Sequence, residues 1–331
     1  MRAVWYTRQG PAAEVLEFGE RPVPEPAAGE LRVRLFASAV NPADCNRRAG
    51  RNHTMEFPLV IPNSDGAGVV DAVGEGVDPA RIGQRVWLYN AQRGRPFGTA
   101  AEYTCVPAEL ATELPEDVTY EEGACLGIPA MTAHRCLFAD GPVEGLSVLV
   151  SGGGGAVGNY AVQLAKWGGA SLVLATASGG WKSADAAAAG ADRVIDRQRE
   201  DVARVVLEMT GGRGVDRVVE VEFGGNLAIW SQVVALNGVV AGYASNAEPQ
   251  PRIPFTALMR RNVTLRGVLL NSAPLAARRQ AQADILAWLK GGRRLHRIAG
   301  RFPLAETAAA HAMVEAGGKR GTVIVLPAEP T

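Results

Sequence analysis

The chain has 331 residues, 47% of them hydrophobic, and its 34 lysines and arginines are balanced by 34 aspartates and glutamates. This length predicts about two domains, and a balanced charge provides no net field to attract nucleic acid or an anionic membrane. The basic cluster GGRRLHR (291–297) is therefore interpreted as a solvated helix end rather than a nucleic-acid site. No apolar run reaches the ~20 residues that a membrane span needs, and the charged first residues do not resemble a secretory signal.

The four cysteines are scattered, without a Cys-x-x-Cys pair, at Cys45, Cys105, Cys125 and Cys136. This spacing does not suggest a disulfide framework. We therefore expect a reduced protein of the cytoplasm.

The first third of the chain is predicted to form short strands separated by turns. Residues 31–37 alternate apolar and polar side chains, as expected for a strand with one buried face. Further β-type runs follow in GAGVVDAVG, RVWLY and AEYTCV, separated by Gly, Pro, Asn and Asp. These runs predict a compact, mostly β domain.

From about residue 146, short apolar runs alternate with stretches of helical periodicity. The runs SVLV, SLVLAT, RVID, VDRVVEV, GVVAGYA and VTLRGVLL are predicted strands, and helices are expected after the glycines, over 182–189 and over 202–209. Strands that alternate with helices predict an α/β fold with a doubly wound parallel sheet.

A run of four glycines (152–155) follows the strand at 147–150 and opens a helix. Gly153, Gly155 and Gly158 match the pattern G-x-G-x-x-G, and the strand–turn–helix context predicts a dinucleotide site. Glycine lets the backbone approach a pyrophosphate, and the first helical residues, Ala156 and Val157, contribute to a helix N-terminus that attracts anions.

The end of the next strand indicates which dinucleotide this site prefers. Thr176, Ala177 and Ser178 stand where an NAD-preferring site usually has Asp or Glu. Lys182 and Arg197 follow, and a hydroxyl with two cations suits a 2′-phosphate. Although Lys182 is also compatible with an ordinary solvated helix position, the missing carboxylate favours NADPH.

The chain resembles the medium-chain dehydrogenase/reductase superfamily, in its zinc-free quinone oxidoreductase branch. The resemblance covers nearly the whole chain and rests on motifs in order: ASAVNPADCNRRAG, PNSDGAGVVDAVGEGV, GQRVW, GIPAMTAHRCL, SGGGGAVGNYAVQLAKWGGA and GKRGTVIVLP. It implies a GroES-like, β-rich catalytic domain over residues 1–124 and 268–331, and a Rossmann NADP(H)-binding domain over 125–267. A homodimer or homotetramer is the expected assembly.

Matching the motifs of the zinc-dependent alcohol dehydrogenases places Asn41, Ser64 and Ile128 at the zinc-ligand positions. These residues do not form a plausible ligand set, and AQRGRPFG lacks the cysteines of a structural zinc, so we expect no metal. An acceptor without a Lewis acid must delocalise the new charge itself. Quinones and α,β-unsaturated carbonyls meet that condition.

The resemblance also implies site residues. Asn41, in an Asn-x-x-Asp motif, and Thr132, in PAMTAH, are expected beside the nicotinamide. We expect Asp44 to fix its loop through local hydrogen bonds rather than to act as an acid. Further residues fall where the cofactor groove of the family runs: Tyr243, Ser245, Asn271 and Lys319.

Asn46 and Asn52 stand where many quinone reductases of this branch carry tyrosines that flank the acceptor. With Asn41 they are the candidate catalytic residues, as neutral donors to an oxygen that gains charge, and Arg48 offers the nearest cation. The alternative is that Asn46 and Asn52 only cap turns.

The predicted function is NADPH-dependent reduction of a small-molecule quinone or similar conjugated acceptor. One alternative is an enoyl reductase that acts on an enone, enal or enoyl thioester, which the sequence does not separate from the first. A second alternative is an NADPH-binding structural or regulatory protein with weak turnover. It is disfavoured because Asn41 and Thr132 are present alongside the phosphate loop.

Overall fold

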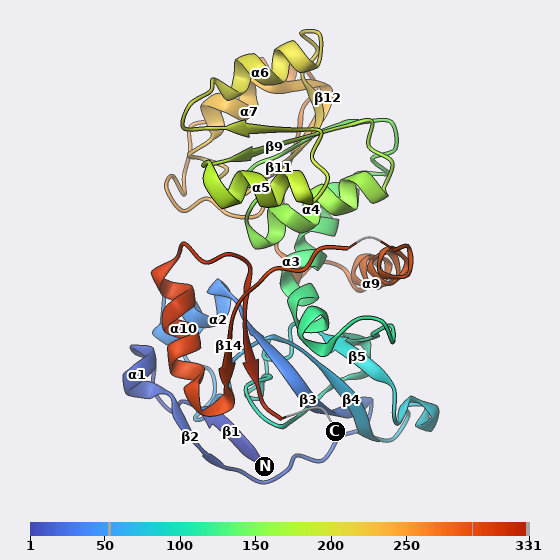
Figure 1. The fold of residues 1–331 in the computed structure, drawn as a ribbon, viewed down its shortest axis with the longest axis vertical. Helices are drawn as coiled ribbons and strands as arrows, with labels where there is room; N and C mark the ends of the chain where they lie inside the picture. Colours follow the sequence, from blue (N-terminus) through green and yellow to red (C-terminus); the bar gives the residue numbers. More distant parts are fainter. Residues whose placement is uncertain (52–53, 293, 329–331) are drawn as a thin grey trace. The chain divides into compact units, whose positions relative to one another are not determined.

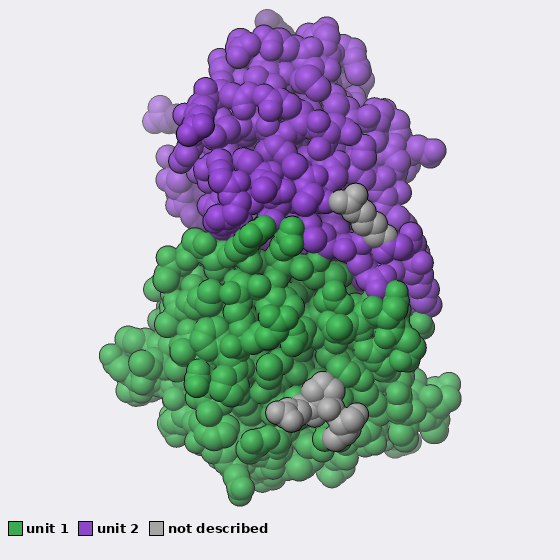
Figure 2. Space-filling model, in the orientation of Figure 1, with its two compact units in different colours: residues 1–128, 296–331 green, residues 129–295 purple. Residues whose placement is uncertain are grey.

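The computed structural model describes residues 1–51, 54–292 and 294–328, and the chain forms two compact units (Figure 2). Unit 1 comprises Met1–Ile128 and His296–Thr331, and unit 2 comprises Pro129–Leu295. Within the described residues, no helix is long and apolar enough to cross a membrane.

Unit 1 is built on a mainly antiparallel sheet with the order β14-β15-β3-β4-β5-β7, in which β6 also pairs with β3 and only β14 and β15 run parallel. The strands are β3 (Glu30–Val40), β4 (Asp65–Val73), β5 (Arg85–Leu88), β6 (Tyr103–Pro107), β7 (Ala111–Glu113), β14 (Ile298–Pro303) and β15 (Thr322–Leu326). A separate hairpin joins β1 (Arg2–Trp5) to β2 (Glu17–Glu20). This arrangement confirms the predicted β-rich domain.

Three helices of unit 1 pack on this sheet or on one another. They are α1 (Ala12–Val15), α2 (Pro42–Ala49) and α10 (Thr307–Ala316), and α10 lies beside α2 and β14 (Figure 1). A shared core of Val40, Cys45, Ala310 and Val323 joins the sheet to both longer helices. The C-terminal helix therefore supports the helix that begins just after Asn41.

Unit 2 is a parallel sheet of order β10-β9-β8-β11-β12-β13, which confirms the predicted doubly wound fold. Its strands are β8 (Ser147–Val150), β9 (Leu172–Ala177), β10 (Arg193–Asp196), β11 (Val215–Glu220), β12 (Val234–Gly242) and β13 (Thr264–Gly267). Helices α4 (Ala156–Trp167) and α5 (Gly180–Ala188) lie on one face, and α6 (Val202–Met209) and α7 (Leu227–Val233) lie on the other (Figure 1). The strand order reverses direction beside β8, and ligands bind outside the carboxyl ends of the strands at such a point.

The remaining helices are α3 (Tyr120–Phe138), α8 (Phe255–Arg260), α9 (Leu275–Lys290) and four short 3₁₀ segments among the described residues: η1 (Pro79–Arg81), η2 (Ala108–Leu110), η3 (Leu270–Ser272) and η4 (Leu304–Glu306). α3 is interrupted at Gly127, whose φ of −8° and ψ of −118° are not helical.

The division into units differs from the predicted domain boundaries chiefly at residue 268. The first boundary falls after residue 128 rather than 124, but residues 268–295, predicted for the catalytic domain, belong to unit 2. The reason is the packing of α9. Its Trp288 ring meets the ring of Tyr160 edge-on with centroids 6.0 Å apart, and Asp284 Oδ2 lies 2.8 Å from His134 Nε2.

Candidate active site

The glycine loop between β8 and α4 has a different requirement at each position. The turn itself falls on Gly152, whose φ is +71°. A Cβ on Gly158 would lie 2.2 Å from the Gly152 carbonyl oxygen, and one on Gly153 would lie 2.7 Å from the Cβ of Ala175. Gly155 is exposed at the N-cap of α4, where a Cβ would approach only the Gly152 oxygen, at 3.3 Å. Gly153 and Gly158 thus allow close packing, and Gly155 keeps the helix N-terminus accessible.

The N-terminus of α4 and its loop form a preorganised set of donors. The N–H groups of residues 156–158 begin the helix, where no intrahelical acceptor is available. Thr176 holds the loop on β9, because its hydroxyl accepts from Gly152 N at 3.0 Å and its carbonyl from Gly153 N at 2.9 Å. N–H donors at a helix N-terminus, beside the carboxyl end of β8, fit the pyrophosphate of a dinucleotide.

The residues predicted for a 2′-phosphate gather at the adjoining ends of β9 and β10. Ser178 follows β9 directly and is half-buried, and Lys182 lies in the first turn of α5 with Nζ 5.6 Å from the centroid of the Trp181 ring. Arg197 follows β10 and is exposed, and its backbone N–H donates to the Ala177 carbonyl at 2.9 Å. The parallel pairing of β9 with β10 brings these three positions to one edge of the sheet.

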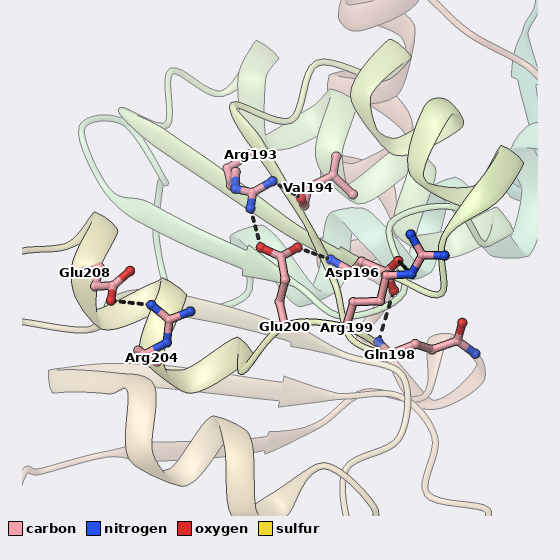
Figure 3. A network of polar contacts seen from close by, with 8 residues as sticks. All are labelled: Arg193, Val194, Asp196, Gln198, Arg199, Glu200, Arg204 and Glu208. Carbon is pink, nitrogen blue, oxygen red and sulfur yellow. Dashed lines mark hydrogen bonds and ion pairs between the residues drawn. The ribbon is translucent and has the colours of Figure 1, made fainter.

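A carboxylate that was not among the predicted site residues lies at this same edge. Asp196 ends β10, and a Cβ on Gly179 would lie only 3.1 Å from Asp196 Oδ2. Arg199 Nε lies 3.8 Å from this carboxylate, and Glu200 accepts the Asp196 N–H and pairs with Arg193 (Figure 3). A negative charge thus stands beside the predicted phosphate residues, partly offset by Arg199. The sequence VID (194–196) indicates this carboxylate, because the aspartate is the last residue of a parallel strand and therefore lies at this edge of the sheet.

Tyr243 and Ser245 follow β12. The Ser245 hydroxyl accepts from Gly224 N at 2.9 Å and donates to the Glu248 carbonyl at 2.5 Å, so this side chain joins two loops. Tyr243 is half-buried, and burial raises the pKa of its phenol well above the ordinary value.

Three further predicted residues lie on separate elements. Thr132 is 7% exposed in α3, and Asn271 is half-buried in η3, both in unit 2. Lys319 belongs to unit 1, where its Nζ donates to the Gly321 carbonyl at 2.6 Å and burial lowers its pKa.

Asn41 stands at the N-cap of α2 and is 6% exposed. Its side-chain Nδ2 donates to Asp65 Oδ2 at 2.7 Å, and its backbone N–H donates to Asp44 Oδ2 at 2.9 Å. Asp44 also accepts from the Ser64 hydroxyl at 2.6 Å, and burial raises the pKa of its carboxyl. The prediction that Asp44 fixes this loop through local hydrogen bonds is confirmed.

The other candidate acceptor residues lie farther along this segment. Asn46 is half-buried in α2, five residues after Asn41, which turns it about 140° around the helix axis from that position. Asn52 lies outside the described residues. Arg48, expected as the nearest cation, is fully buried, with Nη2 2.6 Å from Glu315 Oε2. Its charge is therefore neutralised by α10.

The three positions expected for zinc ligands do come together in unit 1. Ser64 donates to Asp44, and Asp65 Oδ2 accepts from both Asn41 and the Ile128 N–H, the latter at 2.7 Å. In the part of the chain that the structure describes, no group of three His, Cys, Asp or Glu side chains is placed to hold a metal ion. An amide, a hydroxyl and an isoleucine do not fit zinc.

Comparisons with known proteins agree with this architecture. The family model described as "Alcohol dehydrogenase GroES-like domain" matches residues 27–116, and "Zinc-binding dehydrogenase" matches 156–290. The chain is 30% identical over 319 residues to a quinone oxidoreductase of Pseudomonas aeruginosa, covering 95% of this chain and 96% of that protein. It is 34% identical to a 2-methylene-furan-3-one reductase of Solanum lycopersicum, over 75% of this chain and 66% of that one.

A solved mycobacterial structure complexed with NADPH superimposes with a TM-score of 0.83 at 31% identity, over 99% of this chain and 100% of that chain. A GroES-like domain together with a Rossmann domain that carries a glycine loop defines a dinucleotide-dependent dehydrogenase or reductase. The chain belongs to the medium-chain dehydrogenase/reductase superfamily, in its quinone oxidoreductase branch, and is an oxidoreductase.

Proposed function

We propose that this protein is an NADPH-dependent, zinc-independent reductase of quinones or similar conjugated carbonyl compounds. The observation that carries the proposal is the occupancy of the expected zinc positions by Asn41, Ser64 and Ile128, bound to one another through Asp44 and Asp65. The name of the Pseudomonas relative and the NADPH in the mycobacterial structure support the acceptor class and the coenzyme.

The glycine loop fits the coenzyme. When bound, the dihydronicotinamide supplies a hydride. The N–H groups of residues 156–158 bind the pyrophosphate, Gly155 leaves room for it, and Gly153 lets the loop pack closely on β9. Ser178, Lys182 and Arg197 bind the 2′-phosphate through charge-assisted hydrogen bonds. We retain as coenzyme-groove residues, on the pattern of the family, Thr132, Tyr243, Ser245, Asn271 and Lys319.

Asn41 is the proposed donor to the acceptor oxygen. A side-chain amide has two N–H groups, and the bond to Asp65 uses one of them. The second is available to an oxygen that gains negative charge, while conjugation in the acceptor spreads that charge. Asn46 and Asn52 remain proposed neighbours of the acceptor on the pattern of the family alone.

An enone or enoyl reductase is the second candidate, favoured by the likeness to a 2-methylene-furan-3-one reductase. The name of that relative denotes an exocyclic enone, which also accepts a hydride into a conjugated system. Turnover of NADPH with a small quinone, an acyclic enone and an enoyl thioester separates the two. A higher kcat/KM for the quinone supports the first function, and a higher value for the enone or thioester supports the second.

We propose a homodimer formed through β13, which stands at one end of the unit 2 strand order. The segment around it exposes large apolar side chains: Ile253, Phe255, Met259, Leu265 and Leu269. An open strand edge beside such side chains suits antiparallel pairing with the same strand of a second copy, across a two-fold axis. A homotetramer would need a further surface.

We also propose a cytoplasmic location. The four cysteines are free and buried, as is typical of proteins that stay in a reducing compartment.

A further inference from the structure

Asp65 is a fully buried carboxyl at the start of β4 that joins two distant segments. Its Oδ2 accepts from the side-chain amide of Asn41 and from the backbone N–H of Ile128, each at 2.7 Å. These partners lie 24 and 63 positions away along the chain. One oxygen atom therefore ties the N-cap of α2 to the point where α3 resumes after its interruption.

The interruption of α3 accommodates this carboxyl group. A Cβ on Gly127 would lie 2.0 Å from Asp65 Cγ, so any other residue there would displace the carboxyl. The helical segment begins again at Ile128, and a carboxylate next to the first N–H groups of a helix is favourable. The Asp65 backbone is also held, because the Thr99 hydroxyl donates to its carbonyl at 2.7 Å.

This geometry fixes the orientation of the Asn41 amide. Two N–H groups converge on Asp65 Oδ2, so this oxygen is an acceptor whether or not the acid carries a proton on Oδ1. The nitrogen of Asn41 must then face Asp65 and its oxygen must face away. Burial and the nearby Asp44 charge raise the pKa of Asp65 well above its ordinary value. A charged carboxylate is therefore energetically unfavourable at this position.

We propose that Asp65 is a positioning residue that acts through Asn41, holding its amide with one N–H directed at the acceptor oxygen. This inference rests on the role of Asn41 under the proposed function. Asp65 is fully buried, so it acts on the acceptor only through this neighbour.

The test is a double-mutant cycle in turnover. Asp65→Leu keeps the approximate shape and removes the acceptor, Asp65→Asn keeps an acceptor oxygen, and each is measured alone and with Asn41→Ala. We expect D65L to lower kcat by ~10-fold or more, because a misplaced donor stabilises the transition state poorly, while coenzyme affinity changes little. D65N should restore turnover, and D65L should have no further effect in the N41A background, because the two residues act as one unit.

A readout without coenzyme accompanies the cycle. Hydrogen exchange of a peptide covering residues 125–132 should accelerate in D65L and return toward wild type in D65N, because Ile128 N–H regains its acceptor. Asp216→Leu is the matched control, since Asp216 accepts from Ser147 N at 2.8 Å at the opposite end of the unit 2 strands from the glycine loop. It should lose thermal stability without loss of kcat. If D65L does not fold, Asp65→Ser replaces it, because the shorter hydroxyl does not reach either N–H group.

The outcomes separate the inference from the function on which it rests. Equal losses of kcat from D65L in the wild-type and N41A backgrounds, or no loss in either, would overturn positioning by Asp65. If the kcat of N41A equals that of the wild type, Asn41 is not the donor to the acceptor oxygen, and the positioning role of Asp65 is then wrong as well. A loss in N41A with no loss in D65L overturns the Asp65 inference alone.

Discussion

His311 Nε2 lies 2.9 Å from Asn63 Oδ1, so a buried hydrogen bond joins α10 to the loop before β4. The other ring nitrogen lies 3.5 Å from Sγ of Cys45 in α2. Burial lowers the pKa of His311 to about 3, with a further contribution from the Arg48 charge, and burial raises the pKa of Cys45 to about 12. The thiol and imidazole are thus both neutral, and they connect elements of unit 1 rather than forming a nucleophile–base pair.

The pKa of His311 predicts acid lability. Between its ordinary pKa of 6.5 and about 3, the unfolded chain binds a proton at this residue and the native chain does not. The free energy of unfolding should therefore fall with decreasing pH across this window, by about 1.4 kcal/mol per pH unit from this group. His311→Gln, which keeps a donor for Asn63, should flatten that dependence in denaturant titrations from pH 7 to pH 4. The same slope in both proteins would contradict the assignment.

Two glycine variants should separate packing from coenzyme binding. Gly158→Ala places a Cβ 2.2 Å from the Gly152 oxygen, so it should cost about 1–3 kcal/mol of stability. Gly155→Ala meets that oxygen only at 3.3 Å and should fold normally, but its methyl group stands before the α4 N-terminus and should weaken NADPH binding. Thermal unfolding and equilibrium titration measure the two effects. NADPH affinity unchanged in G155A would place the pyrophosphate elsewhere.

Coenzyme preference should depend on the cations at the ends of β9 and β10. Two charge-assisted contacts of about 1.5–3 kcal/mol each predict that Lys182→Ala with Arg197→Ala removes most of the preference for NADPH over NADH. Asp196→Asn should instead increase NADPH affinity, because it removes a negative charge from the same edge. Titrations with both coenzymes measure the ratio. Arg204→Ala is the control, since Arg204 pairs with Glu208 on α6 (Figure 3).

The proposed dimer predicts that a charge on β13 dissociates it. Leu265→Arg should shift the protein to a monomer in sedimentation experiments, because a buried unpaired charge opposes pairing of the two strands. Met209→Arg alters a comparably exposed apolar side chain on α6 and should leave the assembly intact. A wild-type monomer, or a dimer that survives L265R, would rule out this interface.

Local pattern was enough to predict the α/β fold and the glycine loop, because strand and helix periodicities and the glycine motif are contiguous in the sequence. Contacts between distant segments were not visible. Asp65 reaches Asn41 and Ile128 across 24 and 63 positions. The packing of α9 in unit 2 includes a ring contact with Tyr160 and the approach of Asp284 to His134, which no local pattern indicates. The prediction of Arg48 as the nearest cation did not include its neutralisation, because its partner, Glu315, lies far along the chain on α10.

Zinc-independent reduction is best tested by following NADPH oxidation by chelator-treated, metal-analysed protein, with a small quinone in one assay and a saturated ketone in another. We expect full turnover of the quinone with zinc far below one equivalent per chain, and no turnover of the ketone, because Asn41, Ser64 and Ile128 provide no Lewis acid to polarise an isolated carbonyl. Stoichiometric zinc, whose removal abolishes activity, or turnover of the saturated ketone alone, would contradict the proposed zinc-independent function.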